Sequence, residues 1–248
     1  MNKQIFTSIV LLLAIGFILS GCKRENLCDC VKGTGKRKTE TRDVSGFTKI
    51  YMEDKIDVYF TQSLDSSFEV MVEAGNHLLN LIKTEVVDGE LRIKNNNKCG
   101  WMRSYKKDEI KVFVKAPHLY FLNNNSVGNF YCENTLNEKL IDYSVRNSGD
   151  VYLNVICTQA VGHLHGAGDI YISGAAGEHD VHCTGQGFVN AGELTTNYTW
   201  IHYDSSGRAR VKTSGLLYVM LYGSGDVYYT GANTIHSEIY GKGKLISY

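Results

Sequence analysis

A short glycine-centred motif recurs along the second half of the chain at intervals of about twenty residues. Each copy consists of Gly or Ser, any residue and Gly, followed by a short apolar stretch, as in Gly166-Ala167-Gly168 and Gly223-Ser224-Gly225. The second glycines lie at positions 128, 149, 168, 187, 207, 225 and 243, which gives a repeat of 18 to 21 residues. A period of this size, with strand-forming residues in every copy, predicts a solenoid whose coils stack into a shared core.

Aligning the copies on the second glycine separates inward from outward positions. Two columns, four residues before and two residues after the glycine, are apolar and lie an even number of residues apart, so they face the same side of their strands. They contain Val145, Leu164, Cys183, Tyr203, Leu221 and Ile239, and Val151, Ile170, Val189, Ala209, Val227 and Leu245. The pattern predicts an all-β fold, a right-handed parallel β-helix or single-stranded β-solenoid, with a positive φ at each corner glycine.

The first half alternates apolar and polar residues with period two, which is typical of half-buried strands. Residues 42–248 are therefore predicted to form one β-helix domain, with less regular coils over 42–118 and glycine-repeat coils over 119–248. Pro117 is expected to close a strand at the junction. The leucines at 78, 79 and 81 favour one helical turn that leads into a strand.

The N-terminus has the features of an export signal. A basic start and an apolar run from Ile5 to Leu19 precede Leu19-Ser20-Gly21-Cys22, which resembles the lipobox of bacterial lipoproteins. We therefore expect a signal peptide over 1–21, lipidation of Cys22, a flexible spacer over 22–41 and attachment to a membrane through the acyl anchor. This places the protein in the cell envelope as an outer-membrane lipoprotein, on the periplasmic or the surface face.

Charge and cysteine content limit the partners. The chain has 26 basic and 26 acidic side chains, so no overall field favours nucleic acid. Six cysteines besides Cys22 permit disulfides in an exported protein, but the sequence does not define their pairing or the oligomeric state. Those at 132, 157 and 183 fall inside the repeats, where cysteine is expected as a small apolar core residue.

The order of the motifs resembles the bacterial family of putative auto-transporter adhesins with a head GIN domain, which is common in lipoproteins of the Bacteroidetes. The resemblance covers nearly the whole mature chain and rests on Phe47-Thr48-Lys49-Ile50, Ile56-Asp57-Val58-Tyr59-Phe60, Asp88-Gly89-Glu90-Leu91-Arg92-Ile93, Pro117-His118-Leu119 and the Gly-Ser-Gly-Asp repeats. It implies a single-domain right-handed β-helix on the cell envelope with a proposed role in adhesion, and the family offers no established catalytic residues to carry over. Gly187-Phe188 and Gly207-Arg208 depart from the pattern because the acidic residue after glycine is missing.

Two outward columns and one corner column carry candidate site residues. His163, His182 and His202 fall on successive coils about 4.8 Å apart, where imidazoles could bind Zn²⁺ or a similar divalent metal or form a solvated ladder. Tyr152, Tyr171 and Tyr228 form a tyrosine column that could stack on sugar rings or contact a protein, although tyrosine is also a common strand residue. At the corners, Asp150 and Asp169 could bind Ca²⁺, act as an acid/base pair or serve only in the turn.

Three functions remain open at this point. The first is a non-catalytic, membrane-anchored binding or adhesion module that presents a rigid surface to glycan or to an envelope protein. The second is an enzyme that acts on polysaccharide through Asp150 and Asp169. The third is envelope metal binding by the histidine column. No catalytic constellation accompanies the aspartates, so the first hypothesis is favoured and no cofactor is expected apart from a divalent metal.

Overall fold

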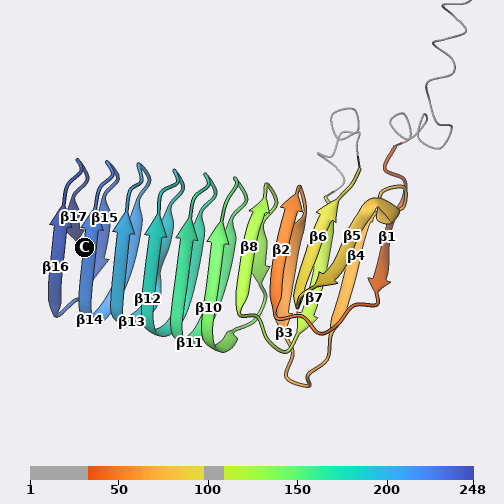
Figure 1. Ribbon diagram of the computed structural model, residues 1–248, viewed down its shortest axis with the longest axis horizontal. Coiled ribbons are helices and arrows are strands. Elements are labelled where there is room, and N and C mark those ends of the chain that lie inside the picture. Colours follow the sequence, from red (N-terminus) through yellow and green to blue (C-terminus); the bar gives the residue numbers. More distant parts are fainter. Residues whose placement is uncertain (1–32, 98–108) are drawn as a thin grey trace, which may run out of the picture.

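The computed structural model describes residues 33–97 and 109–248 and shows a nearly all-β protein, a β-solenoid of about seven turns (Figure 1). The fold class predicted from the repeat is therefore confirmed. The expected signal peptide, Cys22 and the cysteines at 28, 30 and 99 lie outside the described residues. No helix in residues 33–97 or 109–248 meets the length and hydropathy needed to span a membrane.

The glycine-repeat half consists of long bent strands, each of which follows one coil around the solenoid. These are β10 (Leu136–Val145), β11 (Val151–Leu164), β12 (Ile170–Cys183), β13 (Val189–Tyr203) and β14 (Ala209–Leu221). Neighbouring strands pair in parallel from β10 to β14. The last coils are broken into β15 (Val227–Thr230), β16 (Thr234–Ile239) and β17 (Leu245–Ser247). Residues one repeat apart are therefore direct neighbours in adjacent coils.

The N-terminal coils do not stack in the order of the sequence. The strands are β2 (Lys49–Asp54), β3 (Asp57–Gln62), β6 (Glu90–Asn95), β7 (Lys111–Ala116), β8 (Phe121–Ser126) and β9 (Phe130–Cys132). The coil of β2 and β3 lies between β6 and β7 on one side and β8 and β9 on the other, all in parallel (Figure 1). The earlier segment is thus inserted between two later ones. β7 ends at Ala116, so Pro117 closes a strand as predicted.

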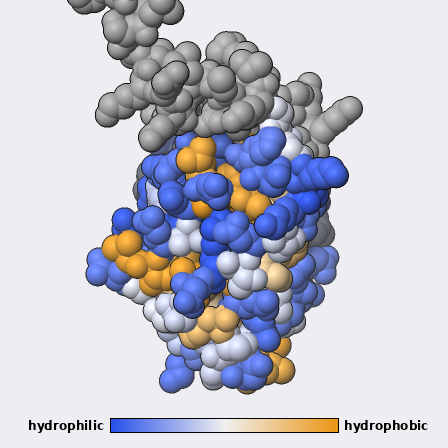
Figure 2. All heavy atoms as spheres, turned by 90° about the vertical axis from the view of Figure 1, so that its right-hand side faces the viewer, coloured by the Kyte–Doolittle hydropathy of each residue, from blue (hydrophilic) through white to orange (hydrophobic). Residues whose placement is uncertain are grey.

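Antiparallel strands cover the N-terminal end of the solenoid. They are β1 (Arg37–Arg42), β4 (Glu69–Gly75) and β5 (Ile82–Val87), with a 3₁₀ turn, η1 (Leu79–Leu81), before β5. β4 pairs with both β1 and β7, while β5 pairs with β6. Figure 2 looks onto this end and shows mainly hydrophilic side chains with a few apolar patches. The expected spacer over 22–41 is therefore too long, because Arg37–Arg42 already pairs with β4.

The inward columns predicted from the alignment form the core. Leu164, Cys183 and Tyr203 lie opposite one another on successive strands and are fully buried. Apolar stacking continues into the N-terminal coils, where the rings of Phe60 and Phe130 lie 6.2 Å apart. The core therefore runs without interruption from the capped end to the last coil. Its driving force is the burial of the apolar columns at the inward positions of the strands, which contributes about 25 cal/mol per Å² of apolar surface.

The corner glycines serve a different purpose from the one predicted. Positive φ values occur at five described glycines, and none of these is a repeat glycine. Instead, a Cβ placed on Gly168 or Gly187 would lie 2.2 or 2.0 Å from the carbonyl oxygen of the repeat glycine in the preceding coil. The same close approach recurs at Gly149, Gly207, Gly225 and Gly243. Glycine is required here because the coils approach backbone to backbone, not because of a left-handed conformation.

Gly187→Ala tests this explanation. The added methyl would overlap a backbone oxygen that cannot rotate away, so the free energy of unfolding should fall by about 3 kcal/mol or more. The matched control is Gly33→Ala, because nothing lies within 4 Å of a Cβ at Gly33. Urea denaturation of both variants measures the difference. Equal stability of Gly187→Ala and the parent chain would contradict the close-approach explanation.

One polar pair is buried inside the core. The Tyr143 hydroxyl and His179 Nε2 lie 2.7 Å apart and both residues are almost completely buried, two coils from one another. Gly162 lies between them, and a Cβ there would approach the Tyr143 hydroxyl at 2.7 Å. The missing side chain at 162 therefore makes room for the tyrosine ring. Burial lowers the pKa of His179 to about 4, so the imidazole is neutral in the folded protein.

This pKa predicts a dependence of stability on pH. The unfolded chain binds a proton at His179 near its ordinary pKa of 6.5, whereas the folded chain does so only near 4. Stability should therefore be unaffected by His179 above pH 6.5 and should fall between 6.5 and 4, by about 3 kcal/mol in total. In His179→Gln this component of the pH dependence should disappear. The outward-facing His182→Gln is the control, and identical pH profiles of His179→Gln and the parent chain would contradict the assignment.

Candidate functional site

The predicted tyrosine column belongs to a longer aromatic ladder on the outer surface. Five rings stack face to face on successive coils, in the order Phe113, Tyr59, Tyr131, Tyr152 and Tyr171. The centroid separations are 5.2, 5.0, 5.0 and 4.7 Å, and the last two rings are inclined by only 4°. Such spacings suit offset aromatic stacking, which adds about 0.5 to 1.5 kcal/mol per pair.

The ladder changes which rings can contact a ligand. The flat faces of the inner rings are covered by their neighbours, so these rings cannot stack on a sugar ring. Tyr171 is the last ring of the stack, and the next coil places Asn190 opposite it. Arg210 follows Asn190, and Tyr228 follows Arg210. The aromatic column is therefore interrupted for two coils, and Tyr171 has one face free of ring contacts.

A groove of about 480 Å³ lies at this interruption. Tyr152, Tyr171, Asn190 and Arg210 line it along the ladder. Cys132, further residues of β11 and β12, Gly192, Glu193 and Tyr248 complete the lining. A bulge in β13 forms part of the groove, because Gly192–Leu194 are three extra residues relative to β14. Leu194 is fully buried and anchors the bulge. The groove thus results from two local departures from the repeat, a missing pair of aromatic rings and a bulge.

At its far end the groove is bounded by the last residue of the sequence. The rings of Tyr248 and Tyr228 meet edge to face at 6.4 Å. A Cβ on Gly192 would come within 2.8 Å of the Tyr248 hydroxyl, so the tyrosine reaches back across the intervening coils to the bulge. The volume falls in the range that binds small molecules, about 300 to 1,000 Å³.

Hydrogen bonds fix the orientation of the tyrosines beside the groove. The Tyr152 hydroxyl donates to Asp150 Oδ2 and the Tyr171 hydroxyl donates to Asp169 Oδ2, each at 3.1 Å. Desolvation is the main cause of the raised pKa of Tyr171, and its hydrogen bond to Asp169 raises the pKa further. Both phenols are therefore neutral donors at physiological pH. Arg210 and Glu193, one cation and one anion, are exposed at the groove.

The corner aspartates form a structural ladder of their own. Asp150 Oδ1 accepts a hydrogen bond from the backbone N–H of Asp169, and Asp169 Oδ1 accepts one from Phe188, both at 2.8 Å. Asp226 accepts an equivalent bond from Lys244. Each carboxylate thus joins its coil to the next, and Asp150 and Asp169 also orient a tyrosine. These contacts are those expected of aspartates that serve in the turn.

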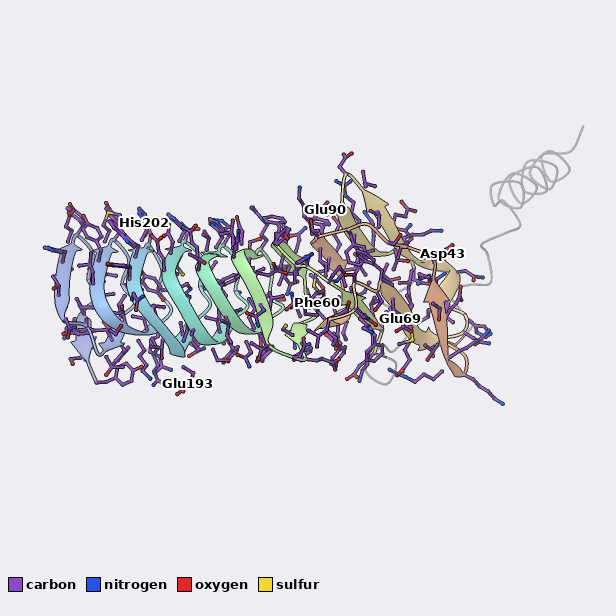
Figure 3. All side chains as sticks on the ribbon, turned by 90° about the horizontal axis from the view of Figure 1, so that it is seen from below. Asp43, Phe60, Glu69, Glu90, Glu193 and His202 are labelled. Atoms are coloured by element: carbon purple, nitrogen blue, oxygen red, sulfur yellow. The ribbon has the colours of Figure 1, made fainter. Side chains whose placement is uncertain are left out.

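The histidine column forms as the alignment predicted, but its rings stack. His163, His182 and His202 lie opposite one another, with ring centroids 5.4 and 6.0 Å apart and planes inclined by 15° and 27°. Stacked imidazoles direct their nitrogens along parallel planes rather than at one point. Within residues 33–97 and 109–248, no group of three His, Cys, Asp or Glu residues could hold a metal ion. The metal hypothesis therefore gains no support. The histidine column is also separate from the groove, since His202 and Glu193 lie on opposite edges of the same coil (Figure 3).

Several residues of the site escaped the sequence analysis. Phe113 and Tyr59 belong to the ladder but precede the glycine repeat, so the alignment did not include them. Glu193 and Gly192 lie in a bulge, whose only sequence signal is the step of 20 residues between Gly187 and Gly207. Tyr228 is in its predicted column, three coils beyond Tyr171, the last of the stacked rings.

With this geometry in place, the relationship to known proteins is informative. The family described as "Putative auto-transporter adhesin, head GIN domain" matches residues 46–233. The chain belongs to this family. The match covers the stacked coils from β2 to β15 and includes every coil that contributes a ring to the aromatic ladder. No curated protein matches the sequence.

Solved structures share the fold at low sequence identity. A protein of Bacteroides fragilis described as a putative adhesin is 23% identical, with a TM-score of 0.82, over 88% of this chain and 100% of its own. A putative adhesin of Parabacteroides distasonis is 21% identical, with a TM-score of 0.65, over 86% and 98% of the two chains. A putative lipid binding protein of the same species is 19% identical, with a TM-score of 0.65, over 88% and 100%. These similarities show that this chain and the three solved proteins share a fold.

Asn190→Tyr tests whether the interruption creates the groove. The new ring would lie on the coil after Tyr171, extend the stack and fill the space beside it. We expect the variant to be more stable than the parent chain by about 1 kcal/mol. Asn197→Tyr, on the same strand but outside the ladder, is the control. Guanidinium denaturation measures both, and destabilisation by Asn190→Tyr alone would show that position 190 cannot continue the ladder.

Proposed function

We propose that this protein is a non-catalytic binding module of the cell envelope that holds a glycan segment in the groove beside Tyr171. The observation that carries the proposal is the interruption of the aromatic ladder. It leaves one tyrosine face uncovered in a concave site of about 480 Å³. Membership of an adhesin family supports a binding role.

The chemistry of the groove suits a saccharide. The C–H face of a sugar ring can pack against the free face of Tyr171, because an aromatic ring offers a large apolar surface with a polar tip. Asn190, Arg210 and Glu193 provide amide, guanidinium and carboxylate groups for the hydroxyls around the ring. A few convergent polar groups around an apolar floor are typical of small-ligand sites. A protein partner would need a contact area of roughly 1,000 Å² or more and would therefore have to contact surface beyond the groove.

The site is also rigid. Tyr171 is held by stacking on Tyr152 and by its hydrogen bond to Asp169, and its strand pairs on both sides. A ligand that binds here would therefore pay little for ordering these side chains. The corner aspartates remain supports in this proposal, since their oxygens already accept hydrogen bonds from a backbone N–H and a tyrosine.

Anchoring completes the proposal. The lipobox predicted at Cys22 precedes β1, which lies at the capped end of the solenoid, whereas the groove lies on the coils of β12 to β14. Figure 1 shows β1 at one end of the solenoid and β12 to β14 toward the other. An acyl chain on Cys22 would thus attach the protein to a membrane on the side of β1 and present the groove away from it. This arrangement fits an adhesin of the cell envelope.

The test is glycan binding by the full chain, first on an array of neutral and uronate-containing oligosaccharides and then by calorimetry with the best ligand. Tyr171→Ala should weaken binding about tenfold or more, since loss of the stacking face costs about 1.4 kcal/mol. Tyr131→Ala is the matched control, because it removes an inner ring whose faces are both covered. Asn190→Tyr should also abolish binding. Glycan binding that survives Tyr171→Ala and Asn190→Tyr, or no binding on the array, would refute the proposal.

A further inference from the structure

The C-terminal end of the solenoid has an uncovered edge strand. β16 pairs in parallel with β14 and with no other strand among the described residues. Its inward positions continue the core columns: Ile235 lies opposite Leu217 and Ile239 lies opposite Leu221. These isoleucines are 38% and 49% exposed, whereas Leu217 and Leu221 are completely buried. The end of the core is thus open to solvent at this strand.

The two ends of the solenoid differ in whether other strands cover the end of the core. At the N-terminal end, β1, β4 and β5 run antiparallel to their neighbours and cover the core. Thr234–Ile239 has no proline, no lysine and no bulge to prevent edge pairing, and Glu238 is its one acidic side chain. An edge of this kind is a template for another strand.

The sequence of the edge is self-complementary when read antiparallel. Thr234–Tyr240 reads Thr-Ile-His-Ser-Glu-Ile-Tyr, which is nearly symmetric about Ser237. We propose that the edge is occupied by β16 of a second copy of this chain, related by a two-fold axis that passes through Ser237. In this register Ile235 of one copy faces Ile239 of the other, and His236 faces Glu238, each pair occurring twice.

In this register the inward faces of the two strands lie on the same side of the joined sheet, and so do their outward faces. Ile235, Ser237 and Ile239 point inward in both copies, so the isoleucine side chains would close the two open cores against each other. Directly opposed residues on antiparallel strands have Cβ atoms about 4.5 to 5.5 Å apart, close enough for both the isoleucine contacts and the histidine–carboxylate pairs. The main-chain groups of the edge would pair as well. Apolar, electrostatic and backbone complementarity therefore select the same register.

The carboxylate in this pairing is already positioned. Glu238 accepts hydrogen bonds from the hydroxyls of Tyr218 at 2.7 Å and of Tyr240 at 2.6 Å. These two bonds hold it on the outer face of the strand, where His236 of the second copy would lie. A two-fold contact of this type is closed, and the opposite end of each copy is capped by β1, β4 and β5, so assembly should stop at the dimer.

The first experiment measures self-association of the full chain by sedimentation velocity in density-matched detergent. The parent chain should form a dimer. His236→Glu should raise the dimer dissociation constant about tenfold or more, because it places two carboxylates opposite each other at two sites. The swapped variant, His236→Glu combined with Glu238→His, should dimerise again because the opposed pairs are restored. A monomeric parent chain, or dimerisation that ignores the single change or is not recovered in the swap, would overturn the proposal.

The second experiment locates the axis. Ser237→Cys should give a disulfide-linked dimer under mild oxidation, since residue 237 would face itself across the axis at a Cα separation of about 4.5 to 5.5 Å, which suits a disulfide. Ser224→Cys, exposed in a corner turn, is the control for the native cysteines and for random collision. Cross-linking of Ser224→Cys to the same extent as Ser237→Cys would overturn the register. Neither experiment involves the groove, so the glycan proposal and the dimer can fail separately.

Discussion

The close approach of successive coils at the glycine corners is the constraint on which the rest of the structure depends. A Cβ on Gly187 would overlap the carbonyl oxygen of Gly168, and the same geometry recurs at each repeat. Where the corners stack this tightly, the strands leaving them must begin in the same register. Every position of the repeat then becomes a column, so that one apolar position builds a core and one aspartate position builds a row of hydrogen bonds between coils. One aromatic position builds the ladder.

Once identical positions are forced into columns, the informative sites are those where a column changes. The tyrosine ladder supplies rigidity along most of its length, because the rings cover one another. It can offer a face to a ligand only where Asn190 replaces the next ring. The histidine column shows the opposite outcome: the repeat brings three imidazoles together, but stacking holds their planes roughly parallel and so directs their nitrogens past a common point. Columns of like residues thus favour stacking over convergence, and convergent groups arise at irregularities such as the β13 bulge.

The sequence revealed the solenoid, its inward columns and the residues of each outward column, because these follow from a period of about twenty and from alternation within each strand. It did not reveal the insertion of β2 and β3 between β6–β7 and β8–β9, because that exchange depends on pairing between segments that lack the glycine repeat. The predicted role of the repeat glycines was also wrong. A position that requires a positive φ and a position that requires close backbone approach are both occupied by glycine, so the sequence does not distinguish them. The free face of Tyr171 could not be predicted, because alignment shows which residues share a column but not how their rings stack.

The difference between the two ends gives the molecule a direction. The capped end carries β1 and therefore the segment that leads back to Cys22, and the open end carries β16. Two copies joined through β16 by a two-fold axis would lie end to end with their N-termini pointing away from each other. If each N-terminus were anchored as the lipobox implies, such a dimer would span two facing membranes, whereas neighbouring copies on one membrane would have to tilt strongly to meet. If the anchor and the β16 dimer both hold, contact between opposed surfaces is favoured, and the groove beside Tyr171 lies a few coils from that contact.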